Sequence, residues 1–99
     1  MIGSWRDPEA EALFEGGRGH GSWQSFLRVA RRKLLMLEAA KRLEDLRKPP
    51  RNMLEPLKGK RLGQHSIRIN DQYRVCFRWG DDNKAYDIEI VDYHDEPRK

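Results

Sequence analysis

The spacing of hydrophobic residues changes once along the chain, at the two prolines in positions 49 and 50. Before them, apolar residues recur every three or four positions, which is the pattern of an amphipathic helix. We expect a helix over residues 22–47, with Ser22 as its N-cap. The apolar stripe shifts to another face near residues 38–39, so a long and a short helix that fold back are the alternative to one continuous helix. The first part of the stripe consists of Trp23, Phe26, Leu27, Ala30, Leu34 and Leu37.

After the prolines, hydrophobic and polar residues alternate with a period of two, which is typical of half-buried strands. We expect strands at residues 67–69, 74–79 and 86–91, and turns at residues 70–72 and 80–83. Because the connecting turns are short, neighbouring strands are antiparallel.

Two weaker strand signals lie at residues 2–5 and 53–57. The resulting order predicts an α+β fold, in which an N-terminal strand and helices pack on one face of a mainly antiparallel twisted sheet. A chain of 99 residues builds one core, so we expect a single small domain over residues 1–99, with residues 95–99 as a flexible tail.

Several function classes lack the features they require. No apolar stretch reaches the length of a membrane span, and the first residues do not resemble a signal peptide. Cys76 is the single cysteine, which excludes an internal disulfide and a cysteine metal site. The glycines do not form a nucleotide-binding loop. We therefore expect a cytoplasmic protein without cofactor or membrane contact.

Charge is distributed unevenly along the sequence. Residues 28–61 carry 12 basic and 4 acidic side chains, whereas residues 81–99 carry 3 basic and 7 acidic ones. A basic middle segment suggests an anionic partner, most simply a nucleic acid. The alternative is that these charges only solvate the outer faces of the helices.

Three arginines of the predicted hairpin share one face. If the alternating apolar residues face the helices, then Arg68, Arg74 and Arg78 project from the opposite side of the sheet. Guanidinium groups bind phosphate oxygens in a bidentate manner, so this face suits a phosphodiester backbone. The alternatives are that the arginines only keep an exposed face soluble, or that Glu89 on the neighbouring strand pairs with one of them.

The end of the last predicted strand collects groups that can exchange protons. His94 titrates near neutral pH, Asp92 can orient it or raise its basicity, and Tyr93 adds a hydroxyl and a stacking ring. The alternative is a solvated C-terminus without chemistry. A metal site made of Asp92, His94 and Asp95 would lack a fourth ligand, so we expect no metal.

Three segments taken together are more diagnostic than any single residue. They are residues 54–59 (LEPLKG), residues 64–79, which contain IRINDQYR, and residues 91–94 (VDYH). In these segments, and more weakly over residues 2–94, the chain resembles the HigB branch of the RelE superfamily of toxins. The resemblance implies a compact α+β fold, in agreement with the periodicity.

The resemblance also implies a function and partners. Such toxins belong to type II toxin–antitoxin pairs, enter the ribosomal A site and cut mRNA, which inhibits translation. The expected partners are therefore the 70S ribosome, mRNA and a HigA-type helix-turn-helix antitoxin. The toxin–antitoxin pair would contact its operator DNA only through the antitoxin. The basic middle segment would then meet ribosomal RNA. No metal or other cofactor is implied.

The implied chemistry assigns roles to individual residues. The 2′-hydroxyl of RNA attacks the adjacent phosphate and leaves a 2′,3′-cyclic phosphate and a 5′-hydroxyl, so two protons must move and negative charge must be neutralised. His94 would donate or accept a proton, with Asp92 as its partner or as the alternative base. Tyr93 would position the nucleotide, and Lys58 and Arg74 would stabilise the transition state. The RNA-binding candidates are Arg68, Arg78, Lys60 and Arg61.

Glu55 departs from the family pattern, because some relatives carry histidine at this position. It is either a further candidate base or a passive strand residue, so the division between acid and base stays open. Two other functions also stay open. One is a ParE-like toxin that binds gyrase and cuts no RNA, and the other is an inactive relative that acts only as a repressor partner.

Overall fold

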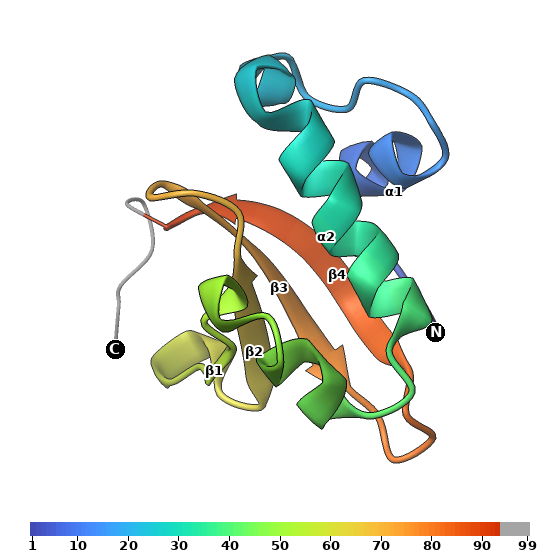
Figure 1. Ribbon diagram of the computed structural model, residues 1–99, viewed down its shortest axis with the longest axis vertical. Coiled ribbons are helices and arrows are strands. Elements are labelled where there is room, and N and C mark those ends of the chain that lie inside the picture. The colour runs from blue at the N-terminus through green and yellow to red at the C-terminus, as the bar shows by residue number, and fades with distance from the viewer. Residues whose placement is uncertain (94–99) are drawn as a thin grey trace.

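The computed structural model describes residues 1–93 and has the expected α+β architecture. Its strands form one antiparallel sheet in the order β1-β2-β3-β4, and the helices pack on one face of it (Figure 1). No helix in this part of the chain combines the length and hydrophobicity needed to cross a membrane. The elements are α1 (Pro8–Phe14), α2 (Leu27–Ala39), β1 (Glu55–Pro56), β2 (Gln64–Arg68), β3 (Tyr73–Trp79), β4 (Ala85–Asp92) and the 3₁₀ segments η1 (Gly21–Phe26), η2 (Leu43–Arg47), η3 (Pro50–Asn52) and η4 (Gly59–Arg61).

The helix predicted over residues 22–47 is divided where its apolar stripe shifts. The α-helical part, α2, ends at Ala39, and Ala40 is extended with a ψ of 131°. The predicted interruption near residues 38–39 is therefore confirmed, with η2 as the short piece, but the long piece is itself divided into the 3₁₀ segment η1 and the α-helix α2, which begins at Leu27. The predicted N-cap is wrong, because the first turn, η1, already begins at Gly21 and Ser22 lies inside it. His20 is the cap, and its Nδ1 accepts a hydrogen bond from the Ser22 amide (3.0 Å).

Helix α1 is not predicted by the periodicity, because its seven residues bury only Ala10 and Leu13. Its start is fixed locally instead. The Asp7 carboxylate accepts hydrogen bonds from the amides of Glu9 (3.0 Å) and Ala10 (3.3 Å). Pro8 occupies the first helical position, where a missing N–H has no cost.

Strands β3 and β4 lie where the alternation predicts them, whereas β2 begins at Gln64, three residues before the strand predicted over residues 67–69, and ends at Arg68. The two weaker signals give shorter elements. The signal at residues 53–57 corresponds to the two-residue strand β1, and the signal at residues 2–5 gives only isolated parallel bridges, from Ile2 to Ala85 and from Trp5 to Ile88. The N-terminal segment therefore lies along the outer edge of β4 without forming a full strand.

The core lies between α2 and the sheet. Ala30, Leu34 and Leu37 of α2 have no exposed surface, and they belong to one cluster with apolar residues from all three long strands. Burial of a large aliphatic side chain contributes about 1.5–3 kcal/mol, so this interface accounts for much of the fold's stability. The fully buried strand residues in the cluster are Ile67, Val75, Phe77, Ala85 and Ile88.

The opposite side of the sheet, which we call the open face, carries the polar members of the alternation. Ile67 pairs with Val75 on the core side, so their neighbours along each strand point away from the helices. A bulge shifts the register of β3 and β4 between Cys76 and Arg78, and Asp87 opposite it has a φ of 54°. The residues of the open face include Gln64, Ser66, Arg68, Arg74, Cys76, Arg78 and Glu89.

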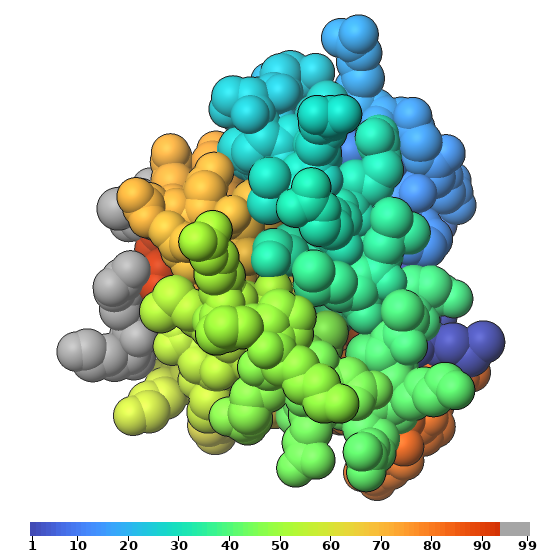
Figure 2. Space-filling view, in the orientation of Figure 1, coloured from blue at the N-terminus to red at the C-terminus, as the bar shows by residue number. Residues whose placement is uncertain are grey.

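The basic middle segment lies on the outside of the molecule. Residues 28–61, coloured from teal to yellow, make up most of the surface in Figure 2. Their charges are therefore spread over α2 and the 3₁₀ segments rather than gathered in the sheet. The exposed basic residues before β1 are Arg28, Arg32, Lys41, Arg42, Arg47, Lys48 and Arg51.

Candidate active site

Arg74 lies at the centre of the open face, where its guanidinium joins three segments of the chain. Its Nε donates to Ser66 Oγ (2.7 Å), and its second terminal nitrogen donates to the Met53 carbonyl (2.7 Å). The Glu55 carboxylate lies 3.5 Å from the same terminal nitrogen. Burial lowers the pKa of Arg74 and the nearby Glu55 charge raises it, but an arginine stays protonated in either case. The site thus contains a positive charge in a fixed position.

The end of β4 brings Tyr93 to this point and Asp92 to the neighbouring turn between β2 and β3. The centre of the Arg74 guanidinium lies 5.1 Å from the centre of the Tyr93 ring, which is a cation–π contact. The Gln72 side chain donates to Asp92 Oδ2 (2.8 Å), and the Gln72 carbonyl accepts a hydrogen bond from the Tyr93 amide. The turn between β2 and β3 therefore holds the end of β4. His94 lies outside the described residues.

The three arginines predicted to project from the sheet do share the open face, but Arg74 does not project into solvent. Only 6% of its side chain is exposed, because the segment before β1 and the Tyr93 ring lie against it. Arg68 pairs with Asp71, and Arg78 lies 3.5 Å from Asp87. The expectation of an exposed arginine is therefore wrong at position 74. Strand alternation identifies a face and says nothing about the segments that cover it.

Glu55 and Lys58 lie on the segment that leads from β1 to η4. Glu55 is half-buried and pairs with Arg74, so this candidate base belongs to the same cluster. Lys58 is exposed at the start of η4, and the structure records no ion pair between it and another residue of 1–93. Gly59 follows with a φ of 62°, a conformation that favours glycine and turns the chain towards η4.

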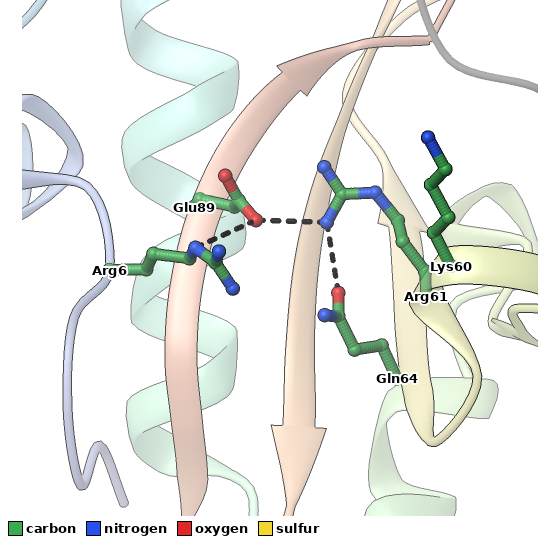
Figure 3. Close-up of a pocket in the computed structure, with 5 residues that line it drawn as sticks. All are labelled: Arg6, Lys60, Arg61, Gln64 and Glu89. Atoms are coloured by element: carbon green, nitrogen blue, oxygen red, sulfur yellow. Dashed lines mark hydrogen bonds and ion pairs between the residues drawn. The ribbon is translucent and has the colours of Figure 1, made fainter.

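Lys60 and Arg61 lie in η4 on the β2 side of the sheet, and the Arg61 side chain extends over the open face towards β4 (Figure 3). Arg61 donates to Glu89 Oε2 (2.8 Å) and to Gln64 Oε1 (3.0 Å) (Figure 3). The RNA-binding residues proposed from the sequence therefore belong to three places. Arg68 pairs with Arg74 in the β2–β3 register, Lys60 and Arg61 lie around Glu89, and Arg78 lies opposite Gln64 and beside Asp87.

A buried polar pair that the sequence analysis missed supports the cluster from the helix side. Lys33 of α2 is 8% exposed, and its Nζ donates to Asn52 Oδ1 (2.6 Å). Burial lowers the pKa of Lys33, and the charges of Arg32 and Arg68 lower it further. Asn52 immediately precedes Met53, whose φ of 47° aims its carbonyl at Arg74. No sequence signal marks this pair, because Lys33 lies among arginines that are mostly exposed.

Within residues 1–93, no three histidine, cysteine, aspartate or glutamate side chains are grouped closely enough to hold a metal ion. The trio Asp92, His94 and Asp95 lies only partly within this range.

A family model described as the RelE-like toxin of the type II toxin-antitoxin system HigB matches residues 3–94. The chain belongs to this family of toxins. Toxin HigB-1 of Vibrio cholerae serotype O1 is 41% identical over 82 residues, which cover 82% of this chain and 86% of the relative. An uncharacterized protein of Haemophilus influenzae is 38% identical over 76 residues, covering 76% of this chain and 75% of the relative.

In this HigB-like toxin, the segments that carry the family resemblance are those that build the cluster around Arg74. Residues 54–59 provide Glu55, and residues 64–79 provide Arg74 with its partner Ser66. Residues 91–94 provide the ring that packs on the guanidinium. The sequence motifs are thus distant along the chain but adjacent on the open face.

Proposed function

We propose that this type II toxin is a ribosome-dependent endoribonuclease that cuts mRNA in the A site by attack of the RNA's own 2′-hydroxyl. The observation that carries the proposal is the arrangement at Arg74, where a buried guanidinium lies beside a carboxylate and an aromatic ring. A fixed cation, a proton acceptor and a stacking surface are the groups that this reaction requires.

The main contribution of Arg74 would be electrostatic. Negative charge develops on the phosphate oxygens as the 2′-hydroxyl attacks, and a cation that is already held by Ser66 and Met53 need not reorganise to meet it. Lys58, at the rim of the same segment, would add a second positive charge. Removal of one such donor typically costs about 2–4 kcal/mol of transition-state stabilisation.

Proton transfer is assigned to the carboxylates and the histidine near the end of β4. His94 would exchange a proton with the substrate, with Asp92 as its partner, and Glu55 is a further candidate base because of its contact with Arg74. Tyr93 would stack against a base of the message while its other face contacts the guanidinium. The chemistry requires no cofactor, since RNA supplies the nucleophile.

The proposed partners are the 70S ribosome with its mRNA in the cytoplasm and a HigA-type antitoxin. The exposed basic residues of the segment 28–61 would meet ribosomal RNA, which has a high density of negative charge. Operator DNA would be contacted only through the antitoxin.

The test compares the purified protein with His94→Ala in a translating extract, followed by mapping of mRNA 5′ ends by primer extension. We expect cuts within the reading frame that require ribosomes and disappear in the variant. His20→Ala is the matched control, because it removes an exposed imidazole at the start of η1 and should leave cleavage intact.

Intact messages and normal translation with the unmodified protein would refute the nuclease proposal. Gyrase-dependent DNA cleavage in a parallel assay would then identify a ParE-like toxin. Absence of both activities would identify an inactive repressor partner.

A further inference from the structure

A small pocket on the open face combines three segments that are distant in the sequence. Its walls are formed by Arg6 from the N-terminal segment, Lys60 and Arg61 from η4, Gln64 from β2 and Glu89 from β4. Its volume is about 240 Å³, which is below the size of pockets for drug-like molecules. Figure 3 shows these side chains on the side of the sheet that faces away from α2.

Glu89 organises the cations of this pocket. Its carboxylate is 18% exposed and lies between two guanidinium groups, 2.8 Å from the Arg61 nitrogen and 3.9 Å from Arg6 Nε (Figure 3). The same Arg61 nitrogen also donates to Gln64 Oε1 (3.0 Å). Arg61 is therefore held by two side chains, and its position does not depend on a ligand.

The pocket has an excess of positive charge. Three cationic side chains face one carboxylate, and the structure records no acidic partner for Lys60 within residues 1–93. The Arg6 side chain is 62% exposed, so a ligand can reach it. Guanidinium and ammonium groups around a small polar space fit a tetrahedral anion such as a phosphate.

The pocket lies close to Arg74 on the same face of the sheet. Glu89 pairs with Cys76 in the β3–β4 register, and Arg74 lies two residues farther along β3 on the same face. Two residues of a strand span about 7 Å. An RNA strand whose reacting phosphate lies at Arg74 can therefore place a neighbouring phosphate at the pocket if it runs along β3.

We propose that this pocket binds a backbone phosphate of single-stranded RNA next to the phosphate that reacts, with Arg6, Lys60 and Arg61 as ligands and Glu89 as the residue that positions the two arginines. The identity of the ligand as RNA rests on the proposed function. Arg6 and Glu89 are new to the interface, because the sequence suggested only Lys60 and Arg61.

The experiment measures binding of the full chain to a fluorescent, fully 2′-O-methylated RNA octamer, which cannot be cleaved. Fluorescence anisotropy at a series of salt concentrations gives the affinity and the slope of log K against log salt. For single strands each phosphate contact contributes about 0.7 to this slope. We expect Lys60→Gln and Arg6→Gln each to weaken binding and to reduce the slope by roughly 0.7. Arg18→Gln, an exposed charge loss in the loop after α1 and outside the basic middle segment, is the matched control and should keep the slope.

A pair of glutamate variants distinguishes an organised phosphate site from a surface that attracts RNA only by its net positive charge. Glu89→Gln and the exposed control Glu44→Gln both remove one negative charge. A surface that attracts RNA only by its net charge would bind more tightly after either change. An organised pocket loses the anchor of Arg61 in Glu89→Gln, so we expect this variant to bind less tightly than Glu44→Gln.

Wild-type slopes in both Lys60→Gln and Arg6→Gln, or equal tightening in the two glutamate variants, would overturn the inference. The translation assay with His94→Ala is performed on the same preparations. Reduced slopes in the two variants, without mRNA cleavage by the unmodified protein, would support the phosphate site and refute the nuclease proposal. Cleavage of mRNA by the unmodified protein, with unchanged slopes in the two variants, would support the nuclease proposal and refute the phosphate site.

Discussion

The Arg74 side chain holds the β1 segment, β2 and the end of β4 together, so its geometry matters as much as its charge. Two of its nitrogens are used by Ser66 and Met53, and its flat face packs on Tyr93. A lysine would retain the charge but cannot make these directional bonds or the flat contact. Substitution by lysine therefore separates the two contributions.

For Arg74→Lys we expect a loss of about 1–3 kcal/mol in the free energy of unfolding, because the Met53 carbonyl loses its donor. The rate of mRNA cleavage should fall by about 10²–10³-fold if the guanidinium stabilises the transition state. Urea unfolding and primer extension measure the two effects. Arg78→Lys is the control for stability, since its side chain is 46% exposed and should cost little. A fully active Arg74→Lys would argue against a guanidinium-specific role.

At the scale of elements, the η3 segment connects the core helix to the candidate site. Asn52 has no exposed surface, and its side chain bonds both Lys33 and the Leu46 carbonyl (3.1 Å). Together with its flanking residues Pro49 and Met53, this segment contains two prolines and a residue in the left-handed region, and its backbone hydrogen bonds from Asn52 to Pro49 and from Met53 to Pro50 stay within the turn. Its position therefore depends on these side-chain bonds.

We expect Lys33→Met to lower the free energy of unfolding by about 1–3 kcal/mol, because the buried Asn52 oxygen loses its donor. Removal of the buried charge offsets only part of this cost. Arg32→Met is the matched control on the same helix, since Arg32 is exposed and its loss should change stability by less than about 0.5 kcal/mol. Chemical denaturation of both variants measures the difference, and equal stabilities would contradict the role given to the pair.

The sequence predicts those elements in which the same spacing of hydrophobic residues continues over many positions. The stripe of α2 and the alternation of β2, β3 and β4 extend over enough residues to define a buried face. Helix α1 is too short for that, and its signal is the Asp7 cap with Pro8. The site is less predictable, because Lys33 meets Asn52 and Arg6 meets Glu89 only through the tertiary fold. Family motifs identified the residues around Arg74, whereas only the structure reveals that Arg74 is buried.

At the scale of the whole molecule, His65 makes stability depend on pH. It lies on the core side of β2, where its ring stacks on Phe77, and its buried Nδ1 has no hydrogen-bond partner within residues 1–93. Burial lowers the pKa of His65, and the positive charge of Arg47 lowers it further. In the unfolded chain its pKa is near 6.5. The unfolded state therefore takes up a proton at a pH at which the folded state does not.

Above about pH 7, His65 is neutral in both the folded and the unfolded state, so it adds no pH dependence to the free energy of unfolding. As the pH falls through about 6.5 towards the folded-state pKa, only the unfolded state takes up the proton, and the free energy of unfolding decreases. We expect His65→Gln to be less sensitive to pH between about 7 and 5 than the unmodified protein. Urea unfolding at intermediate pH values measures this difference. His20→Gln serves as the control for an exposed imidazole, and parallel curves for His65→Gln and the unmodified chain would contradict the assignment.

The N-terminal segment that lies along β4 also determines how another chain can approach the sheet. Between Ala85 and Ile88, the outward amides and carbonyls of β4 are bonded to residues 1–6, and the Ile90 amide lies 3.4 Å from the Asp7 carboxylate. Unpaired strand edges are the usual templates for strand addition by a partner or by aggregating copies. This edge is already occupied by the protein's own backbone. A partner chain that added a strand here would first have to displace the N-terminal segment, and with it Arg6 from the phosphate pocket.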